Sequence, residues 1–259
     1  MINLLSACLI TLNEEDNLPR ALASLAGIAD EIVVVDCGSR DRTPEIAREF
    51  GAKVITRAWT NFADQKNAAV AAASHDWILS LDADEELGPE LRDALLAWKG
   101  KKTGYAVYEF ARRAWYEGGW IRHSGWYPDR QRRLFRRDAA RFFGVVHESL
   151  QFQGQPGRLR GDLLHYTIRS FPEHEEKVER YTTLAAQQMY AAGKRSWRGA
   201  MWLATPWNWF NSYVLHLGIL DGARGLTISR MAARSTWLKF KKLGMLIGTE
   251  RRAERVRTP

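Results

Sequence analysis

The chain of 259 residues contains only two cysteines, Cys8 and Cys37. So few cysteines exclude a disulfide framework and favour a reducing compartment. No apolar run reaches the roughly 18–20 residues that a membrane-spanning helix needs. The first residues also lack the basic segment and apolar core of a secretory signal peptide, so we expect a cytoplasmic protein.

Two glycine-rich phosphate-binding motifs are absent as well. Neither G-x-x-x-x-G-K-[ST] nor G-x-G-x-x-G follows the first apolar run of the chain. These motifs use glycine because the backbone must come close to a phosphate. Their absence argues against P-loop nucleoside triphosphatases and against dinucleotide-dependent dehydrogenases.

Acidic residues are scarce near the C-terminus. From Ala191 onward the chain has thirteen Lys and Arg residues and only three acidic ones, so the tail accounts for the net charge of +8. Such an asymmetric distribution predicts an anionic partner or surface for the tail.

Strand and helix patterns alternate through residue 84. The short β-branched or apolar runs predict strands at Leu4–Ile10, Glu31–Asp36, Lys53–Ile55 and Asp76–Asp84. Between them we expect helices at Asn17–Leu25, Glu45–Phe50 and Phe62–Ala73. Thr43 is the predicted N-cap of the second helix, and Pro44 its first residue. This order predicts right-handed βαβ units in a mostly parallel sheet.

The pattern changes after Gly104. Tyr105–Phe110 alternates like a half-exposed strand, and Ser170 with Pro172 predicts the start of a helix over Glu173–Ala192. Trp197–Lys242 is predicted to be largely helical with an interruption at Pro206, and Thr249–Pro259 to be a frayed basic tail.

Polar residues follow three of the predicted strands, at Thr11–Glu14, Asp36–Ser39 and Asp82–Asp84. In open α/β sheets, ligands bind at the carboxyl ends of the strands. Asp82 and Asp84, two positions apart in extended chain, point the same way and could face one hard cation. The alternative is a solvated acidic turn before the helix at Pro89. Three such ends at one edge favour a nucleotide site with a metal ion on its diphosphate.

The same segments resemble family 2 glycosyltransferases, the inverting enzymes of GT-A fold that use nucleotide-activated sugars. The matching segments are Thr11-Leu12-Asn13-Glu14-Glu15, Glu31–Asp41, Gln65-Lys66-Asn67 and Leu81-Asp82-Ala83-Asp84. Further segments are similar to the branch that includes lipopolysaccharide inner-core β-1,4-glucosyltransferases: Gly119-Trp120, Trp126–Phe135, Val146-His147-Glu148 and His165-Tyr166-Thr167.

The resemblance implies an α/β fold of GT-A type, with a Rossmann-like, mostly parallel sheet flanked by helices. The catalytic domain would span residues 1–170, with a nucleotide-sugar half at 1–100 and an acceptor half at 101–170. Residues 171–259 would form a helical, Trp-rich, basic appendage. The implied reaction moves a hexose, expected to be glucose, from a UDP-linked sugar to a saccharide of the lipopolysaccharide core by metal-assisted direct displacement.

The resemblance also assigns roles to residues. Those expected to bind the donor are Thr11, Asn13, Glu14, Asp36, Ser39, Lys66 and Asp82. Asp84 would ligate Mg²⁺ or Mn²⁺ on the diphosphate, with Asp82 reaching the ribose or a metal-bound water. A divalent ion there stabilises the negative charge that develops on the leaving group. Each also has a structural interpretation: Asp36 as a helix cap, Lys66 as a solvated helix residue, and Thr11 and Asn13 as turn formers.

An inverting transfer needs a general base for the acceptor hydroxyl, and the candidates are Glu148 and Asp129. We favour Glu148 because it follows a strand-like stretch; its alternative is a cap or a partner for nearby arginines. His147 and His165 are either a further metal ligand or structural residues. In the arginine-rich segment, Arg133 is the candidate for binding the diphosphate or a phosphorylated acceptor, since guanidinium groups bind phosphate bidentately.

Five tryptophans occur among the basic residues of the C-terminal region, at positions 197, 202, 207, 209 and 237. Trp207–Leu220 is too short and too polar to span a bilayer. The composition instead fits an interfacial helix on anionic lipid at the cytoplasmic face of the inner membrane, where a lipid-anchored acceptor would be met. The alternative is a helical subdomain that packs on the catalytic domain.

Four other functions can be compared with this one from the sequence. Within the same enzyme class, the chain could be a polyprenyl-phosphate sugar synthase or a protein glycosyltransferase. The basic aromatic tail could bind nucleic acid, but that reading leaves the acidic strand ends unexplained, so we expect no nucleic-acid partner. A catalytically inactive nucleotide-binding scaffold is disfavoured by the intact Asp82 and Asp84 pair. Nothing in the sequence indicates an oligomeric state.

Overall fold

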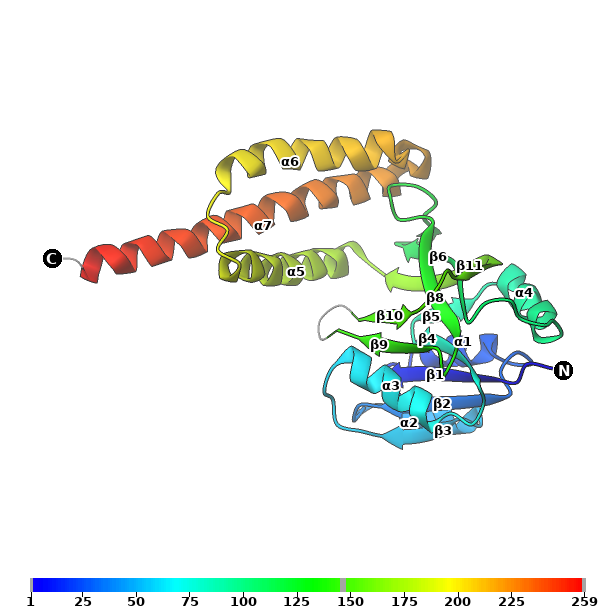
Figure 1. Ribbon diagram of the computed structural model, residues 1–259. Helices are drawn as coiled ribbons and strands as arrows, with labels where there is room; N and C mark the ends of the chain where they lie inside the picture. Colours follow the sequence, from blue (N-terminus) through cyan, green and yellow to red (C-terminus); the bar gives the residue numbers. More distant parts are fainter. Residues whose placement is uncertain (1, 145–147, 258–259) are drawn as a thin grey trace. The chain divides into compact units, whose positions relative to one another are not determined.

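The computed structural model describes residues 2–144 and 148–257 (Figure 1). The chain divides into two compact units. The sheet unit comprises the residues up to Arg113 together with Pro128–Tyr166. The helical unit comprises Ala114–Tyr127 together with the residues from Thr167 onward. The helical unit therefore combines a segment from the middle of the chain with the C-terminal residues, and the expected domain boundary at residue 170 stays a prediction.

The sheet unit alternates strands and helices in its first half and is mostly strands in its second. Its elements are β1 (Leu5–Thr11), α1 (Leu18–Ser24), β2 (Glu31–Asp36), α2 (Thr43–Glu49), β3 (Lys53–Thr56), α3 (Phe62–Ala72), β4 (Trp77–Asp82), β5 (Glu85–Leu87), α4 (Pro89–Lys99), β6 (Val107–Tyr116), β8 (Asp129–Arg136), β9 (Ala140–Phe143), β10 (Ser149–Phe152) and β11 (Gly157–Ile168). Strands β6 and β11 continue into the helical unit at their ends.

The main sheet has the strand order β3-β2-β1-β4-β8-β6-β11-β5. Its first four strands are parallel, and β8 joins β4 in antiparallel register. Thr11 lies opposite Asp36, and Ile10 opposite Asp82, so three of the predicted polar strand ends share one edge. The predicted α/β fold with parallel strands and a helical C-terminal region is confirmed.

Helices cover both faces of the parallel strands because side chains alternate between the faces. Leu9 of β1 and Val34 of β2 pack in one core cluster with residues of α1 and α4. Cys8 and Val33 pack in a second cluster with the alanine-rich face of α3. Strands that are apolar on both faces are expected when both are buried.

The helical unit contains the short strand β7 (Gly119–Trp120) and three long helices, α5 (Phe171–Ala191), α6 (Arg198–Phe210) and α7 (Gly222–Arg257). Between α6 and α7 the chain forms a π-helical turn, η1 (Asn211–Leu215), and a 3₁₀ turn, η2 (Gly218–Asp221). Helix α7 contacts both α5 and α6 (Figure 1). As predicted, Ser170 caps α5 by accepting a hydrogen bond from the Glu173 N–H.

Three local predictions were wrong. The N-cap of α2 is Arg42, and Thr43 is already helical; its hydroxyl instead accepts a hydrogen bond from the Glu14 N–H. Pro206 lies inside α6 without ending it, because α6 packs against α7. The backbone of α7 is helical through Arg257 rather than frayed from Thr249, since Ile247 still packs in the helical core.

Candidate active site

Asp36 organises the end of β2. Its carboxylate accepts hydrogen bonds from the Thr11 hydroxyl (3.0 Å), the Ser39 hydroxyl (2.5 Å) and the N–H groups of Gly38 (3.0 Å) and Ser39 (2.9 Å). Asp36 is 1% exposed and does not cap α2. It instead fixes the turn after β2 and joins it to the end of β1.

The loop after β1 is held against the loop after β2. Asn13 has a left-handed backbone (φ 55°), its N–H donates to Ser39 Oγ (2.9 Å), and its Oδ1 accepts from the Arg40 N–H (2.9 Å). Asparagine is among the few residues that tolerate this conformation. Glu14 lies in the same loop, where its carboxylate accepts from Asn17 Nδ2 (2.7 Å). Asn13 therefore does form a turn, and it places Glu14 beside the Asp36 cluster.

Lys66 of α3 lies between two carboxylates. Its Nζ is 2.9 Å from Asp82 Oδ1 at the end of β4 and 2.9 Å from Glu148 Oε1 just before β10. The side chain is 4% exposed and also lies near the Phe142 ring. Lys66 is therefore a buried bridge between distant parts of the sheet unit and not a solvated helix residue.

Arg133 of β8 contacts Asp82 from the other side. The same guanidinium group lies 2.7 Å from Glu85 Oε1, and Glu85 is fully buried. Burial alone would raise the pKa of Asp82, but Arg133 and Lys66 outweigh it and hold that pKa well below its usual value. The Arg133 Nε is buried and has no hydrogen-bond partner among the described residues.

Arg112 of β6 extends this ion-pair network to Asp129. It lies 3.1 Å from Glu85 Oε1 and 2.6 Å from Asp129 Oδ2. Burial opposes the charge on Arg112, but Glu85 and Asp129 together raise its pKa above the usual value. Asp129 also accepts from Gln131 Nε2 (2.8 Å). The network thus links the two candidate bases, with Glu148 at the Lys66 end and Asp129 at the Arg112 end.

A cavity of about 410 Å³ opens at this network. Four of the predicted site residues line it: Lys66, Asp82, Arg133 and Glu148. They come from α3, β4, β8 and the residue before β10, so the cavity assembles residues that are far apart in sequence. We take this cavity as the candidate active site because the predicted carboxylates and cations meet there.

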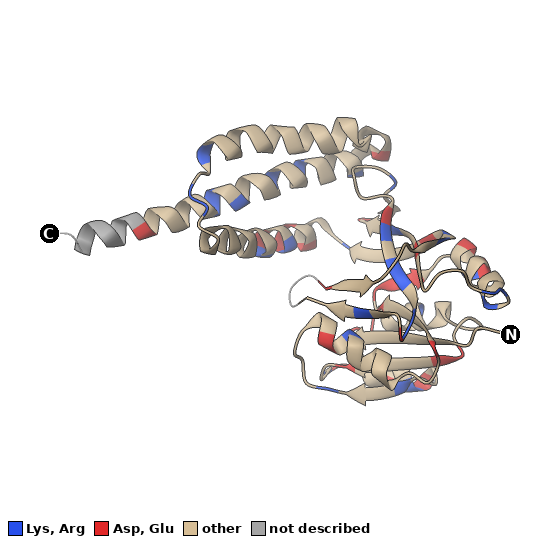
Figure 2. Cartoon of the chain, in the orientation of Figure 1, with Lys and Arg blue, Asp and Glu red and all other residues tan. Residues whose placement is uncertain are grey.

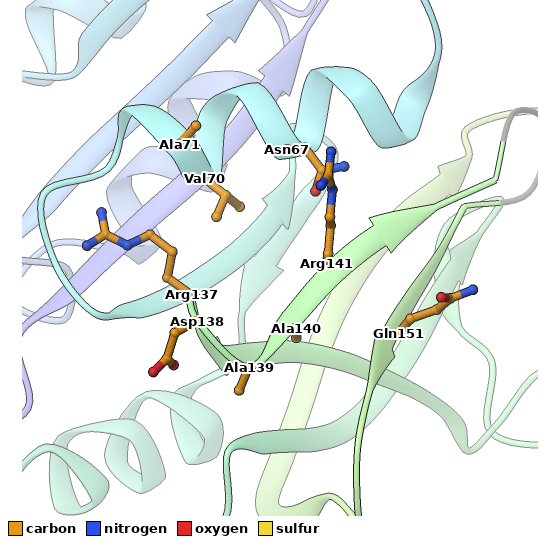
Figure 3. Close-up of a pocket in the computed structure, with 9 residues that line it drawn as sticks. All are labelled: Asn67, Val70, Ala71, Arg137, Asp138, Ala139, Ala140, Arg141 and Gln151. Atoms are coloured by element: carbon orange, nitrogen blue, oxygen red, sulfur yellow. The ribbon is translucent and has the colours of Figure 1, made fainter.

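A larger cavity, of about 580 Å³, lies beside α3 (Figure 3). Its lining comes from α3 at Asn67, Val70 and Ala71, from residues 137–141, and from Gln151. None of the predicted site residues lines it, and Arg137 there is already engaged by the Ala73 carbonyl. Its volume alone does not make it the better candidate.

Asp84 lies beside His165. The Asp84 Oδ2 is 3.2 Å from His165 Nε2, and the Tyr166 N–H donates to the Asp84 carbonyl (3.0 Å), which fixes the two strands β5 and β11 at this point. Both side chains are partly exposed. A carboxylate and an imidazole suit Mn²⁺, and a carboxylate suits Mg²⁺.

Asp84 and His165 could supply two ligands to a metal ion whose other ligands come from a substrate. Within residues 2–144 and 148–250 no three His, Cys, Asp or Glu side chains gather at a metal-binding distance. Asp82, the other predicted ligand, has its carboxylate engaged by Lys66 and Arg133. Asp84 and His165 are thus the groups available to a cation, and a diphosphate would supply the remaining oxygen ligands. His147, the other candidate, lies outside the described residues, as do Val145 and Val146.

Sequence reasoning missed Glu85 and Arg112. Glu85 follows Asp84 directly and looked like one more residue of an acidic turn, yet it is 0% exposed and paired with two arginines. No local pattern marks such a residue, because its partners lie on β6 and β8. The only signal was the unusual number of arginines in two strand-like segments.

The comparisons with known proteins agree with these observations. A family model described as Glycosyl transferase family 2 matches residues 6–153, which is more than half of the chain. The chain belongs to this family. It is therefore an enzyme of the transferase class, and the predicted family is confirmed.

Curated relatives extend the similarity beyond the matched domain. This glycosyltransferase is 35% identical over 202 residues to the lipopolysaccharide core biosynthesis glycosyltransferase LpsC of Rhizobium meliloti, covering 74% of this chain and 73% of that one. It is 28% identical over 251 residues to an uncharacterized glycosyltransferase of Rickettsia typhi, covering 92% of this chain and 86% of that one.

A weaker likeness connects it to a solved structure. Glucosyl-3-phosphoglycerate synthase from Mycobacterium tuberculosis, crystallised with Mn²⁺, uridine diphosphate and glucosyl-3-phosphoglycerate, is similar at a TM-score of 0.36 and 24% identity. The similarity covers 45% of this chain and 45% of that one.

Proposed function

We propose that this glycosyltransferase moves a hexose, expected to be glucose, from a UDP-linked sugar to a saccharide of the lipopolysaccharide-core type, with inversion at the anomeric carbon. The observation that carries the proposal is the cavity in which Lys66 bridges Asp82 and Glu148. The name of the relative LpsC supports an acceptor from the lipopolysaccharide core.

In this proposal the donor nucleotide binds along the edge of the parallel strands. Thr11, Asn13, Asp36 and Ser39 are tied together at the ends of β1 and β2, and Glu14 lies in the same loop. Their hydroxyl and carboxylate oxygens would face the base and ribose. The Nε of Arg133, which has no hydrogen-bond partner in the described part of the chain, would donate to the diphosphate, because guanidinium groups bind phosphate strongly.

The metal would be held by Asp84, with His165 as its neighbour in the same site. A bound Mg²⁺ or Mn²⁺ supplies charge stabilisation to the departing diphosphate. Asp82 would serve instead to hold Lys66 and Arg133 at the cavity and to accept from the ribose. We assign the metal to Asp84 and not to Asp82 because the Asp82 carboxylate is already paired with two cationic side chains, Lys66 and Arg133.

Glu148 is the proposed base. It would take the proton of the acceptor hydroxyl as that oxygen bonds to the anomeric carbon and the bond from this carbon to the diphosphate oxygen breaks. The contact with Lys66 Nζ orients the Glu148 carboxylate at the cavity. Asp129 is the second candidate, but Arg112 and Gln131 both donate to it, so fewer of its lone pairs are open to an acceptor.

The acceptor class has two alternatives, a polyprenyl phosphate and a protein. A lipid-anchored saccharide would bring the enzyme to a membrane, which fits the basic Trp-rich region predicted to lie on anionic lipid. In the part of the chain that the structure describes, no helix has both the length and the apolarity to cross a bilayer.

The test is a panel of nucleotide sugars, assayed by thermal stabilisation and by transfer to isolated core saccharides, with Mn²⁺ or with excess chelator. We expect UDP-glucose with metal to give the largest stabilisation and the highest turnover. Asp84→Ala should lower turnover by about 10²-fold or more and weaken Mn²⁺ binding measured directly by calorimetry. Undiminished turnover of Asp84→Ala in excess chelator would overturn the metal assignment.

A further inference from the structure

The segment from α6 to η2 is unusual in charge. Between Arg198 and Asp221 no residue is Asp, Glu, Lys or Arg. Figure 2 shows this as an uninterrupted uncharged stretch along α6, with basic residues at its start. These residues nevertheless form surface helix and turns, so the missing charge is not explained by burial in the core.

Polar side chains from α6 and from η1 form hydrogen bonds with α7. Asn208 Nδ2 donates to the Thr236 hydroxyl of α7 (2.8 Å), and the hydroxyls of Ser212 and Ser229 lie 3.0 Å apart. Ser212 and Ser229 are buried, and Met201 is the one buried residue of α6. The segment from α6 to η1 thus meets α7 through two hydrogen bonds between polar side chains, beside the apolar side chain of Met201.

The opposite side of α6 carries large apolar side chains. Trp202 is 72% exposed, Leu203 75% and Trp207 57%. Leu203, Trp207 and Phe210 follow one another at helical spacing and form one stripe. The exposed apolar surface continues after α6 at Val214, Leu215, Leu217, Ile219 and Leu220. We call these residues, with Trp202, the apolar face.

This arrangement is inverted relative to a helix in water, which turns its apolar stripe toward the protein. In a membrane environment the opposite order is stable, because lipid covers apolar side chains while polar groups pair between helices. An apolar surface of this extent marks an interaction site. Apolar side chains outward and hydrogen bonds inward together point to lipid as the partner.

The charge around α6 and the length of this helix indicate how it would contact a membrane. Lys194 and Arg195 precede α6, Arg198 is its first residue, and Arg224 follows η2, so cations lie at both ends of the uncharged segment. Tryptophan and flanking cations are the composition of an interfacial helix on anionic lipid. At 13 residues α6 is about 20 Å long, shorter than the roughly 30 Å bilayer core. The helix would therefore lie in the plane of the membrane.

We propose that the apolar face inserts into the interfacial layer of an anionic bilayer and holds the enzyme at the surface where a lipid-anchored acceptor resides. The inference rests on the proposed function only in the choice of acceptor. It also narrows the expected membrane contact, which the sequence assigned to the Trp-rich basic C-terminal region, to α6 and the turns after it.

The test is flotation of the full chain with vesicles of phosphatidylethanolamine and phosphatidylglycerol. Leu203→Gln/Trp207→Gln removes two members of the apolar face. Trp59→Gln/Leu96→Gln is the matched control, because it makes the same two changes at exposed positions of the sheet unit, where Trp59 is 46% and Leu96 49% exposed. We expect vesicle binding to weaken about tenfold or more in the first variant only.

Four further readouts make the result decisive. Brominated lipid should quench tryptophan fluorescence in the wild type and less in Leu203→Gln/Trp207→Gln. Both variants should keep thermal stabilisation by nucleotide sugars and transfer to a soluble, delipidated acceptor. If the wild type itself showed neither, that result would contradict the proposed function and leave the membrane inference unaffected. The inference is overturned if Leu203→Gln/Trp207→Gln floats with vesicles as well as the wild type does. It is also overturned if the wild type sediments as a dimer and this variant as a monomer, because the apolar face would then bind a second copy of the chain.

Discussion

The two units of this glycosyltransferase arrange polarity in opposite ways. In the sheet unit, Glu85 is fully buried and Lys66 nearly so, each paired with opposite charges. In the helical unit, Trp202 and Leu203 are more than 70% exposed, while Asn208 and Ser212 form hydrogen bonds with α7. Each unit therefore departs from the usual distribution at one place.

Each departure has a cost that a function explains. Burying ions is unfavourable unless close partners satisfy them, and replacing such a network by apolar residues is often neutral or stabilising. Exposing large apolar side chains to water is unfavourable as well. The buried network of the sheet unit surrounds the candidate active site, and the exposed face of the helical unit is the proposed lipid contact. The comparison of the two units thus separates the candidate active site from the proposed membrane-binding surface.

The strongest test of the sheet-unit side is Glu148→Gln. This change keeps the shape and the Lys66 contact but removes the base, so transfer should fall by about 10²–10⁴-fold while nucleotide-sugar binding persists. Turnover in saturating donor, together with donor affinity by calorimetry, measures the two effects separately.

Asp129→Asn is the paired variant. Because Asp129 is held by Arg112 and is 40% exposed, we expect a much smaller loss of turnover. If Asp129→Asn were the inactive variant and Glu148→Gln turned over normally, the roles of the two carboxylates would be exchanged.

The next largest effect is expected on stability, from Arg133→Met. Removal of this buried guanidinium leaves Asp82 and Glu85 with one cationic partner each, and breaking such a pair costs about 3–5 kcal/mol of unfolding free energy. Chemical denaturation measures the change. Arg130→Met, at an exposed position three residues earlier, should alter the unfolding free energy by no more than about 0.5 kcal/mol. Equal destabilisation by both variants would show that the buried ion-pair network contributes no more to the unfolding free energy than an exposed arginine does.

The pH dependence of stability follows from Asp82. Because Arg133 and Lys66 hold its pKa below the usual 3.8, the ionised carboxylate contributes stability that is complete above that pH and is lost as the pH falls through the lower folded value. The destabilisation caused by Asp82→Asn should therefore be constant between about pH 5 and 8 and shrink below about pH 4. A difference that persists unchanged in acid would mean that Asp82 acts through its shape and not its charge.

The strands and helices of the sheet unit were predicted well from the sequence, because each is marked by residues that are close together in the chain. The β-branched runs at Glu31–Asp36 and the polar residues after each strand mark both the elements and the edge where they end. The partners of those residues were not predictable. Lys66 meets Glu148 across 82 positions and Arg133 meets Glu85 across 48, and no local pattern sets such pairings.

The helical unit was predicted less well for a related reason. Pro206 and the glycines suggested interruptions, yet contact with α7 keeps α6 continuous. The tryptophans predicted lipid contact or packing, but only the structure shows that Trp202 and Trp207 point away from α7 while Asn208 points toward it. Which side of a helix is buried depends on its neighbour, and a mixed apolar pattern does not determine that side.

The smallest predicted effect tests the helical-unit side of the comparison. Asn208→Leu removes the hydrogen bond to Thr236 and should lower the unfolding free energy in water by about 0.5–1.5 kcal/mol, leaving a buried hydroxyl with its α7 carbonyl as the remaining partner. Leu203→Gln should leave the unfolding free energy within about 0.5 kcal/mol, since it alters an exposed position. Thermal denaturation of the two variants should therefore rank the polar Asn208 above the apolar Leu203 for stability. If Leu203→Gln were the more destabilising change, α6 would be packed through its apolar side, and the inverted arrangement on which the lipid contact depends would be wrong.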